Sequence, residues 1–155
     1  MLAGMSNFAA GSAFAATIVA LGASNTYGKG VARNQAFPAQ LETILRAKGL
    51  NVRALNAGIN GDTTEGMLRR LDSAVPSGAN AVILQPGGND GRKGSPDRTA
   101  EIQNRLSARG IAVIMLPNNV FKSLPHQPDG QHLTPEGYHM IAESLAAQVA
   151  GVIGR

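Results

Sequence analysis

The sequence predicts one α/β domain of three layers (α/β/α), in which helices cover both faces of a parallel sheet. The chain has 155 residues, a length that suits a single hydrophobic core. Apolar residues make up 43% of it and charged residues only 15%, so there is enough apolar material to fill that core. From Thr17 onward, short apolar runs alternate with amphipathic stretches. This alternation is typical of parallel strands connected through helices.

Four short apolar runs are expected to be the strands. They occupy residues 17–21, 51–56, 81–85 and 111–116. Because a helix-like stretch separates each run from the next, the strands must run parallel and be joined by right-handed crossovers. The expected architecture is a flavodoxin-like, doubly wound sheet of four or five strands with helices on both faces.

Proline, glycine and small polar residues mark the ends of four expected helices. The first covers residues 37–48, where Pro38 suits the opening turn and Gly49 a left-handed cap at the end. The third is expected to run from Ser95-Pro96 to Gly110. The other two have polar N-caps, which are Asp62 or Thr63 for the second helix and Thr134 for the last.

Residues 1–16 are interpreted as a leader remnant or a flexible arm that precedes a domain at residues 17–155. Residues 1–28 contain no charged side chain, and Ala13-Phe14-Ala15-Ala16 resembles the small-x-small end of a secretory leader. The basic segment that begins such leaders is missing. The expectation is a periplasmic or secreted protein, or otherwise a cytoplasmic one. Glycines and polar residues interrupt the apolar run, so stable membrane insertion is not expected.

Composition excludes several function classes. The chain has no cysteine, so a disulfide scaffold, a thiolate metal site and a cysteine nucleophile are ruled out. Its net charge is +4, but the basic residues are dispersed, and only two Tyr, four Phe and no Trp are available to stack on bases. Nucleic-acid binding is therefore not expected, and neither a metal nor an organic cofactor is implied.

The polar residues of interest follow the expected strands. In open parallel sheets, ligands bind at the carboxyl ends of the strands, so these loops should meet at one edge. They contain a hydroxyl, an imidazole, a carboxylate and several potential oxyanion donors, which acyl transfer requires. The four loop motifs are Gly22-Ala23-Ser24-Asn25, Asn60-Gly61-Asp62-Thr63, Gly87-Gly88-Asn89-Asp90 and Asp129-Gly130-Gln131-His132.

Three of these side chains could form a nucleophilic system. A serine hydroxyl is a poor nucleophile at neutral pH and needs a base such as histidine within hydrogen-bond reach. His132 is the candidate base for Ser24, and Asp129 could hold its other ring nitrogen and stabilise the imidazolium. The candidate oxyanion donors are Gly61, the Asn89 side chain and the Ser24 amide.

The four motifs, in this order, resemble the blocks of the SGNH hydrolases, also called GDSL-type esterases and lipases, over roughly residues 18–153. The resemblance is closest to small bacterial arylesterases, thioesterases and lysophospholipases. It implies a catalytic triad of Ser24, Asp129 and His132, and an oxyanion hole formed by Ser24, Gly61 and Asn89. It further implies a serine hydrolase that cleaves carboxylic esters or thioesters of small or short-chain acyl groups.

This sequence departs from the family pattern in three places. Ala23 and Asn25 stand where the first block has Asp and Leu. Only residues 117–128 lie between the fourth strand and Asp129, so the helix and fifth strand that the family usually inserts there are expected to be absent. Gln85-Pro86 is an unfamiliar lead-in to the third block.

Other functions are considered beside the esterase. A carbohydrate acetylesterase of the same fold and a non-catalytic binding domain derived from it remain alternatives. A phosphate-binding loop near Lys29 is disfavoured, because Ala23 stands where that pattern needs glycine and Gly30 where it needs Ser or Thr. The natural substrate and the oligomeric state do not follow from the sequence.

Overall fold

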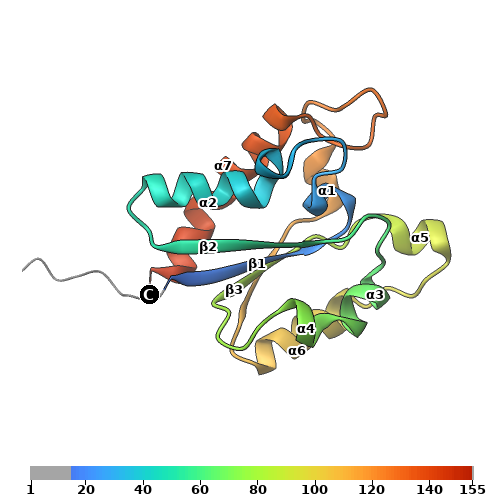
Figure 1. The fold of residues 1–155 in the computed structure, drawn as a ribbon. Helices are drawn as coiled ribbons and strands as arrows, with labels where there is room; N and C mark the ends of the chain where they lie inside the picture. Colours follow the sequence, from blue (N-terminus) through green and yellow to red (C-terminus); the bar gives the residue numbers. More distant parts are fainter. Residues whose placement is uncertain (1–14, 155) are drawn as a thin grey trace, which may run out of the picture.

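The computed structural model describes residues 15–154 of the chain. The leader or arm expected at residues 1–16 therefore lies almost wholly outside the described residues, and Ala16 already belongs to the first strand. The described residues form a three-layer α/β/α domain around one parallel sheet (Figure 1). The fold class expected from the sequence is confirmed.

The sheet has four strands among the described residues, in the order β2-β1-β3-β4. Every neighbouring pair is parallel, and Val19 at the centre of β1 is in register with Leu55 on one side and Val82 on the other. All four expected runs are strands, each within two residues of its expected bounds. The strands are β1 (Ala16–Gly22), β2 (Val52–Gly58), β3 (Ala81–Leu84) and β4 (Ala112–Met115).

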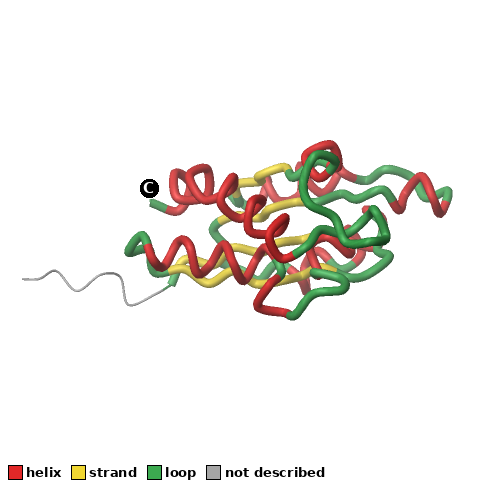
Figure 2. Tube along the Cα trace, turned by 90° about the horizontal axis from the view of Figure 1, so that it is seen from above, coloured by secondary structure: helices red, strands yellow, loops and turns green. Residues whose placement is uncertain are grey.

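Helices α2 (Phe37–Ala47) and α7 (Pro135–Ile153) cover one face of the sheet. Side chains alternate along a strand, and Ile18 and Ala20 of β1 point to this face, where they join a buried cluster with both helices. Figure 2, viewed from above, shows the long helices of this layer running along the strands.

The other face is covered by α3 (Thr64–Arg69), α4 (Leu71–Ala74) and α6 (Thr99–Ala108). Val19 and Leu21 of β1 point to this side and belong to the second buried cluster, with Met67, Ile102 and Leu106 from the helices. The sheet is thus packed between two layers of helix. The loops at its carboxyl edge are built on that support.

Two helix boundaries differ from the sequence prediction. The helix expected from Ser95-Pro96 begins only at Thr99, because residues 95–98 are held as a connecting segment, in which the Ser95 amide donates to the Asp90 carbonyl (2.9 Å) and the Arg98 amide to the Thr64 hydroxyl (2.8 Å). The helix expected after Thr63 is broken at Arg70, whose backbone leaves the helical range (φ −100°, ψ 10°). A tertiary contact lies at each place, since Arg98 contacts Thr64 and the Arg70 side chain donates to carbonyls of β1 and β2.

Four short segments were not anticipated. They are α1 (Ser24–Tyr27), α5 (Asn89–Lys93) and two 3₁₀ turns, η1 (Arg33–Gln35) and η2 (Asn118–Phe121). Three of them, α1, α5 and η2, carry residues of the candidate site. Within the described part of the chain, none of the helices has the length and apolar character needed to cross a membrane.

Candidate active site

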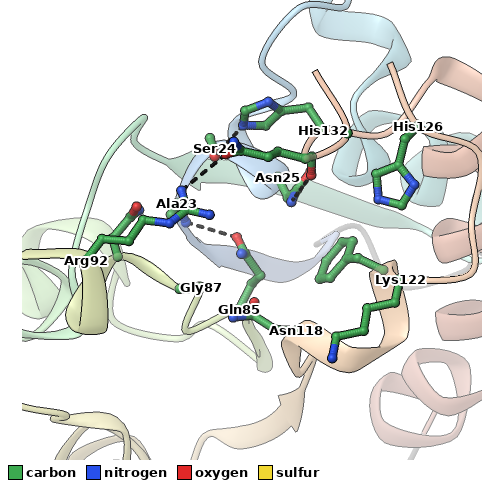
Figure 3. Close-up of a pocket in the computed structure, with 15 residues that line it drawn as sticks. Ala23, Ser24, Asn25, Gln85, Gly87, Arg92, Asn118, Lys122, His126 and His132 are labelled. Carbon is green, nitrogen blue, oxygen red and sulfur yellow. Dashed lines mark hydrogen bonds between the residues drawn. The ribbon is translucent and has the colours of Figure 1, made fainter. Parts of the chain in front are cut away.

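The loops after β1, β3 and β4 surround a cavity of about 230 Å³ at the carboxyl edge of the sheet (Figure 3). The part of the β4–α7 connection that directly precedes α7 also lines the cavity and carries His132. The expected convergence of loops at one edge is therefore present for three of the four motifs. The second motif contributes differently, since Gly61 is not among the residues that line the cavity.

Ser24 is the first residue of α1, directly after the tight turn that ends β1. This turn requires glycine at position 22, because a Cβ there would lie 2.2 Å from the Thr26 hydroxyl oxygen and 2.6 Å from Gln85 Oε1. Ala23 then points inward and is 1% exposed. The turn leaves Ser24 facing the cavity.

Ser24, His132 and Asp129 are hydrogen-bonded in series. His132 Nε2 lies 2.9 Å from Ser24 Oγ, and His132 Nδ1 is hydrogen-bonded to Asp129 Oδ2. The imidazole is largely shielded from solvent, with His132 7% exposed. When Asp129 is ionised, Nδ1 must be the protonated nitrogen of the neutral ring, so Nε2 is free to accept the Ser24 hydroxyl proton.

The Asp129 carboxylate is held by three hydrogen bonds. Besides the His132 side chain, the backbone amides of His132 (3.0 Å) and Gln131 (2.9 Å) donate to its Oδ1. The bond from the His132 side chain, followed by those from the two amides, lowers the pKa of Asp129 well below its usual value. The carboxylate is therefore ionised at neutral pH.

Gln127 fixes the loop that carries His132. Its backbone amide donates to the His132 carbonyl at 2.7 Å. Its side-chain amide donates to the carbonyls of Lys29 and Leu133, each at 2.8 Å. This glutamine therefore ties the histidine loop to the loop that follows α1. Nothing local distinguishes Gln127 from an exposed loop residue, so this role could not be predicted from the sequence.

Two of the three expected oxyanion donors face the cavity. The Ser24 amide lies in the first turn of α1 and has no acceptor among residues 15–154. Asn89 Nδ2 donates one hydrogen to the Asp62 carbonyl at 2.9 Å, which leaves its second hydrogen for a ligand. Gly61 has a positive φ of 77°, and its carbonyl accepts from Lys93 Nζ at 2.5 Å. Its place in the oxyanion hole stays a prediction.

Gln85 fixes the loop that carries Ser24, which explains the unfamiliar lead-in to the third motif. The side chain is 2% exposed, and its Oε1 accepts from the Ala23 amide (3.0 Å) and the Thr26 hydroxyl (2.8 Å). Both donors belong to the turn around Ser24. A polar residue at the end of a wholly apolar strand was the available signal for this role.

Asn25, which replaces the family's leucine, joins the serine loop to the histidine loop. Its Nδ2 donates to the Gln131 carbonyl at 3.3 Å, and its Oδ1 accepts from the Tyr138 hydroxyl at 2.9 Å. Tyr138 lies on α7 and is fully buried, and burial raises the pKa of its hydroxyl to about 12. The hydroxyl thus stays protonated and donates. The two residues are 113 positions apart in the chain, so no local sequence pattern could indicate this contact.

Asp62 and Arg70 support the other side of the site. Arg70 Nε donates to Asp62 Oδ2 at 2.8 Å, and its Nη2 donates to the carbonyls of Gly22 (3.2 Å) and Ala57 (2.9 Å) at the ends of β1 and β2. The Asp62 carbonyl in turn accepts from Asn89. Asp62 is therefore a brace for this edge, while the N-cap of α3 is Thr63.

The parallel α/β/α sheet, with a serine, a histidine and an aspartate in series at its carboxyl edge, defines the class of SGNH-type hydrolases. Residues 20–152 match the GDSL-like Lipase/Acylhydrolase family. The chain belongs to this family, and the resemblance stated from the sequence is confirmed.

Known relatives agree with this assignment. The esterase TesA of Pseudomonas aeruginosa is 32% identical over 110 residues, a match that covers 67% of this chain and 55% of TesA. The chain thus spans about half the length of that relative. A solved structure of the psychrotrophic esterase EstA from Pseudoalteromonas sp., inhibited by monoethylphosphonate, is similar with a TM-score of 0.72 and 18% identity over 90% of this chain and 99% of that one.

A crystal structure of TesA is similar to the same degree. Its TM-score is 0.71 at 23% identity, over 88% of this chain and 99% of that one. The SGNH-hydrolase family esterase AlinE4 gives a TM-score of 0.59 at 25% identity, over 89% of this chain and 96% of that one. At 18% and 23% identity, EstA and TesA support the fold rather than a particular substrate.

Proposed function

We propose that this chain hydrolyses carboxylic esters or thioesters of small acyl groups through an acyl-enzyme on Ser24. The observation that carries the proposal is the series of hydrogen bonds from Ser24 Oγ through the His132 ring to Asp129. Such a series activates a serine hydroxyl, because it places a correctly oriented base at the nucleophile and a carboxylate behind the base.

In acylation, Ser24 Oγ attacks the carbonyl carbon of the ester while His132 Nε2 takes its proton. The carbonyl oxygen becomes an oxyanion, for which the Ser24 amide and the free hydrogen of Asn89 Nδ2 are the proposed donors. Asp129 remains ionised and stabilises the imidazolium. His132 then gives the proton to the departing alcohol or thiol, which leaves the acyl group bonded to Ser24.

In deacylation, a water molecule takes the place of the departed alcohol. His132 Nε2 removes one proton from this water as its oxygen attacks the acyl carbon. The second tetrahedral intermediate collapses, the bond to Ser24 Oγ breaks, and the proton returns to that oxygen. The products are a carboxylic acid and the regenerated serine.

The size of the cavity supports a small acyl group. Its volume of about 230 Å³ is below the roughly 300–1,000 Å³ of pockets that hold drug-sized ligands. The segment between β4 and Asp129 is short, and η2 is its only regular element among the described residues. A long acyl chain would therefore extend into solvent. Because most of it would not be buried, it would add little to the binding energy.

The test is hydrolysis of p-nitrophenyl esters, from acetate to longer acyl chains, by the wild type and by Ser24→Ala. Removal of the nucleophile should lower kcat by roughly 10⁴-fold or more. The rate should also fall as the acyl chain grows. Ser123→Ala changes an exposed serine of the loop after η2 and is the matched control. Equal activity in wild type and Ser24→Ala would contradict the proposal, and inactivity in both would favour a binding domain.

A further inference from the structure

We propose that the ester taken by this cavity carries a negatively charged group, which Arg92 and Lys122 bind. The inference rests on the proposed esterase function and names its substrate class. It starts from two positively charged side chains that line the cavity from different loops. In Figure 3 they lie on opposite sides of Ser24.

Arg92 is placed beside the reacting groups by the same short helix that begins with Asn89. Its Nη1 donates to the Gln131 Oε1 at 3.2 Å, next to His132 in the chain. This amide orients the guanidinium but does not neutralise it. No carboxylate among residues 15–154 lies within 4.0 Å of it, so its charge is available to a ligand.

Lys122 follows η2 and lies next to Phe121, which also lines the cavity. Its ammonium has no hydrogen bond or ion pair with any residue in the described part of the chain. Four of the other arginines do have carboxylate partners within 4.0 Å: Arg46, Arg70, Arg98 and Arg105. Other basic residues of the described chain, such as Arg53 and Lys48, also lack a carboxylate partner within 4.0 Å, so what sets Arg92 and Lys122 apart is that their free charges line the cavity.

The rest of the lining favours an anion as well. No Asp or Glu lines the cavity, and its other polar side chains include the amides of Asn118 and Gln131. The nearest acidic residue of the motif, Asp129, is engaged by His132 and two backbone amides. A cleft lined by charge of one sign attracts ligands of the opposite sign, and a guanidinium can bind a carboxylate or phosphate through two hydrogen bonds.

The test compares anionic and neutral esters of nearly the same shape. For a charge on the alcohol part, the pair is 4-acetoxybenzoate and 4-acetoxybenzamide. For a charge on the acyl part, it is mono-4-nitrophenyl adipate and its methyl ester. The quantity measured is the ratio of kcat/KM for the anionic ester to that for the neutral one. Dividing a variant's ratio by the wild-type ratio cancels the intrinsic reactivity of the esters.

The variants are Arg92→Gln and Lys122→Gln, with Arg53→Gln and Lys48→Gln as matched controls. Both control residues are exposed, and neither lines the cavity. For at least one pair of esters, the ratio should fall about two- to fivefold in each cavity variant, the range of a partly exposed ion pair. It should stay constant in the controls. Added NaCl should lower the wild-type ratio, because salt screens exposed charges.

Hydrolysis that depends on Ser24, with ratios unchanged in both cavity variants for both pairs, would overturn this inference and leave the esterase function intact. Full activity of Ser24→Ala would instead overturn the esterase function. Binding of 4-hydroxybenzoate and 4-hydroxybenzamide, measured by NMR titration, then tests the anion site without turnover. Tighter binding of the benzoate that is lost in the cavity variants supports the site, and equal binding of the two contradicts it.

Discussion

Gln85→Met tests the idea that one buried amide oxygen holds the nucleophile's turn in place. The substitution keeps the length of the side chain but removes the acceptor of two hydrogen bonds. The Ala23 amide and the Thr26 hydroxyl both donate to Gln85 Oε1, and both residues are buried, at 1% and 0% exposure. Each buried donor left without an acceptor costs about 1–3 kcal/mol.

The expected loss of unfolding free energy is therefore about 2–6 kcal/mol, less whatever the Thr26 hydroxyl regains by rotating to another acceptor. For a chain of this length, 1 kcal/mol corresponds to a shift in Tm of about 2–4 °C. Activity should fall too, because Ser24 directly follows Ala23. Urea unfolding gives the first quantity, and kcat/KM for p-nitrophenyl acetate gives the second.

Thr26→Val separates the two donors. If the threonine hydroxyl has no acceptor in Gln85→Met, the loss of unfolding free energy in the Gln85→Met/Thr26→Val double variant should be smaller than the sum of the losses in the two single variants. Gln148→Met, on an exposed position of α7, is the matched control and should lie within about 0.5 kcal/mol of wild type. A Gln85→Met protein as stable and active as this control would show that the Gln85 amide does not hold the turn around Ser24.

The remaining predictions concern the oxyanion donor and the carboxylate. Asn89→Ala should lower kcat by roughly 10²–10³-fold with a smaller change in KM, because its amide acts on charge that develops in the transition state. An unchanged kcat removes Asn89 from the oxyanion hole. Asp129 has a lowered pKa in the folded state, so its stabilising contribution is present above its unfolded pKa of 3.8 and is lost as the pH falls below it. The stability difference between wild type and Asp129→Asn should therefore shrink between pH 5 and pH 2, and a constant difference across about this range contradicts the assignment.

The sheet could be predicted because its signals are local. Each strand is a short apolar run bounded by polar or glycine residues, and the parallel arrangement follows from the helices between them. Where local signals met a tertiary competitor, the prediction was wrong. Ser95-Pro96 is a good helix start, but hydrogen bonds from the Ser95 and Arg98 amides to Asp90 and Thr64 hold residues 95–98 as a connecting segment.

The candidate site also contains residues whose position could be predicted from the sequence and residues whose position could not. Ser24, Asn89, Asp129 and His132 stand in motifs after strands, so their meeting at one edge could be foreseen. The residues that hold them there could not, because their partners are distant in the chain. Gln85 contacts Ala23 across 62 positions. Tyr138 contacts Asn25 across 113. Helix and strand patterns in a sequence indicate contacts between residues only a few positions apart, so they cannot predict either of these.

The most direct test of Ser24 as the nucleophile is covalent labelling by an alkyl p-nitrophenyl phosphonate, followed by peptide mass mapping. Phosphonates mimic the tetrahedral intermediate and react with activated serines. If Ser24 is the nucleophile, a single adduct is expected on the peptide that contains Ser24, formed in step with the loss of esterase activity. No labelling of His132→Ala is expected at the same reagent concentration. Loss of activity with the adduct on another residue, or full activity with Ser24 labelled, would contradict this role of Ser24.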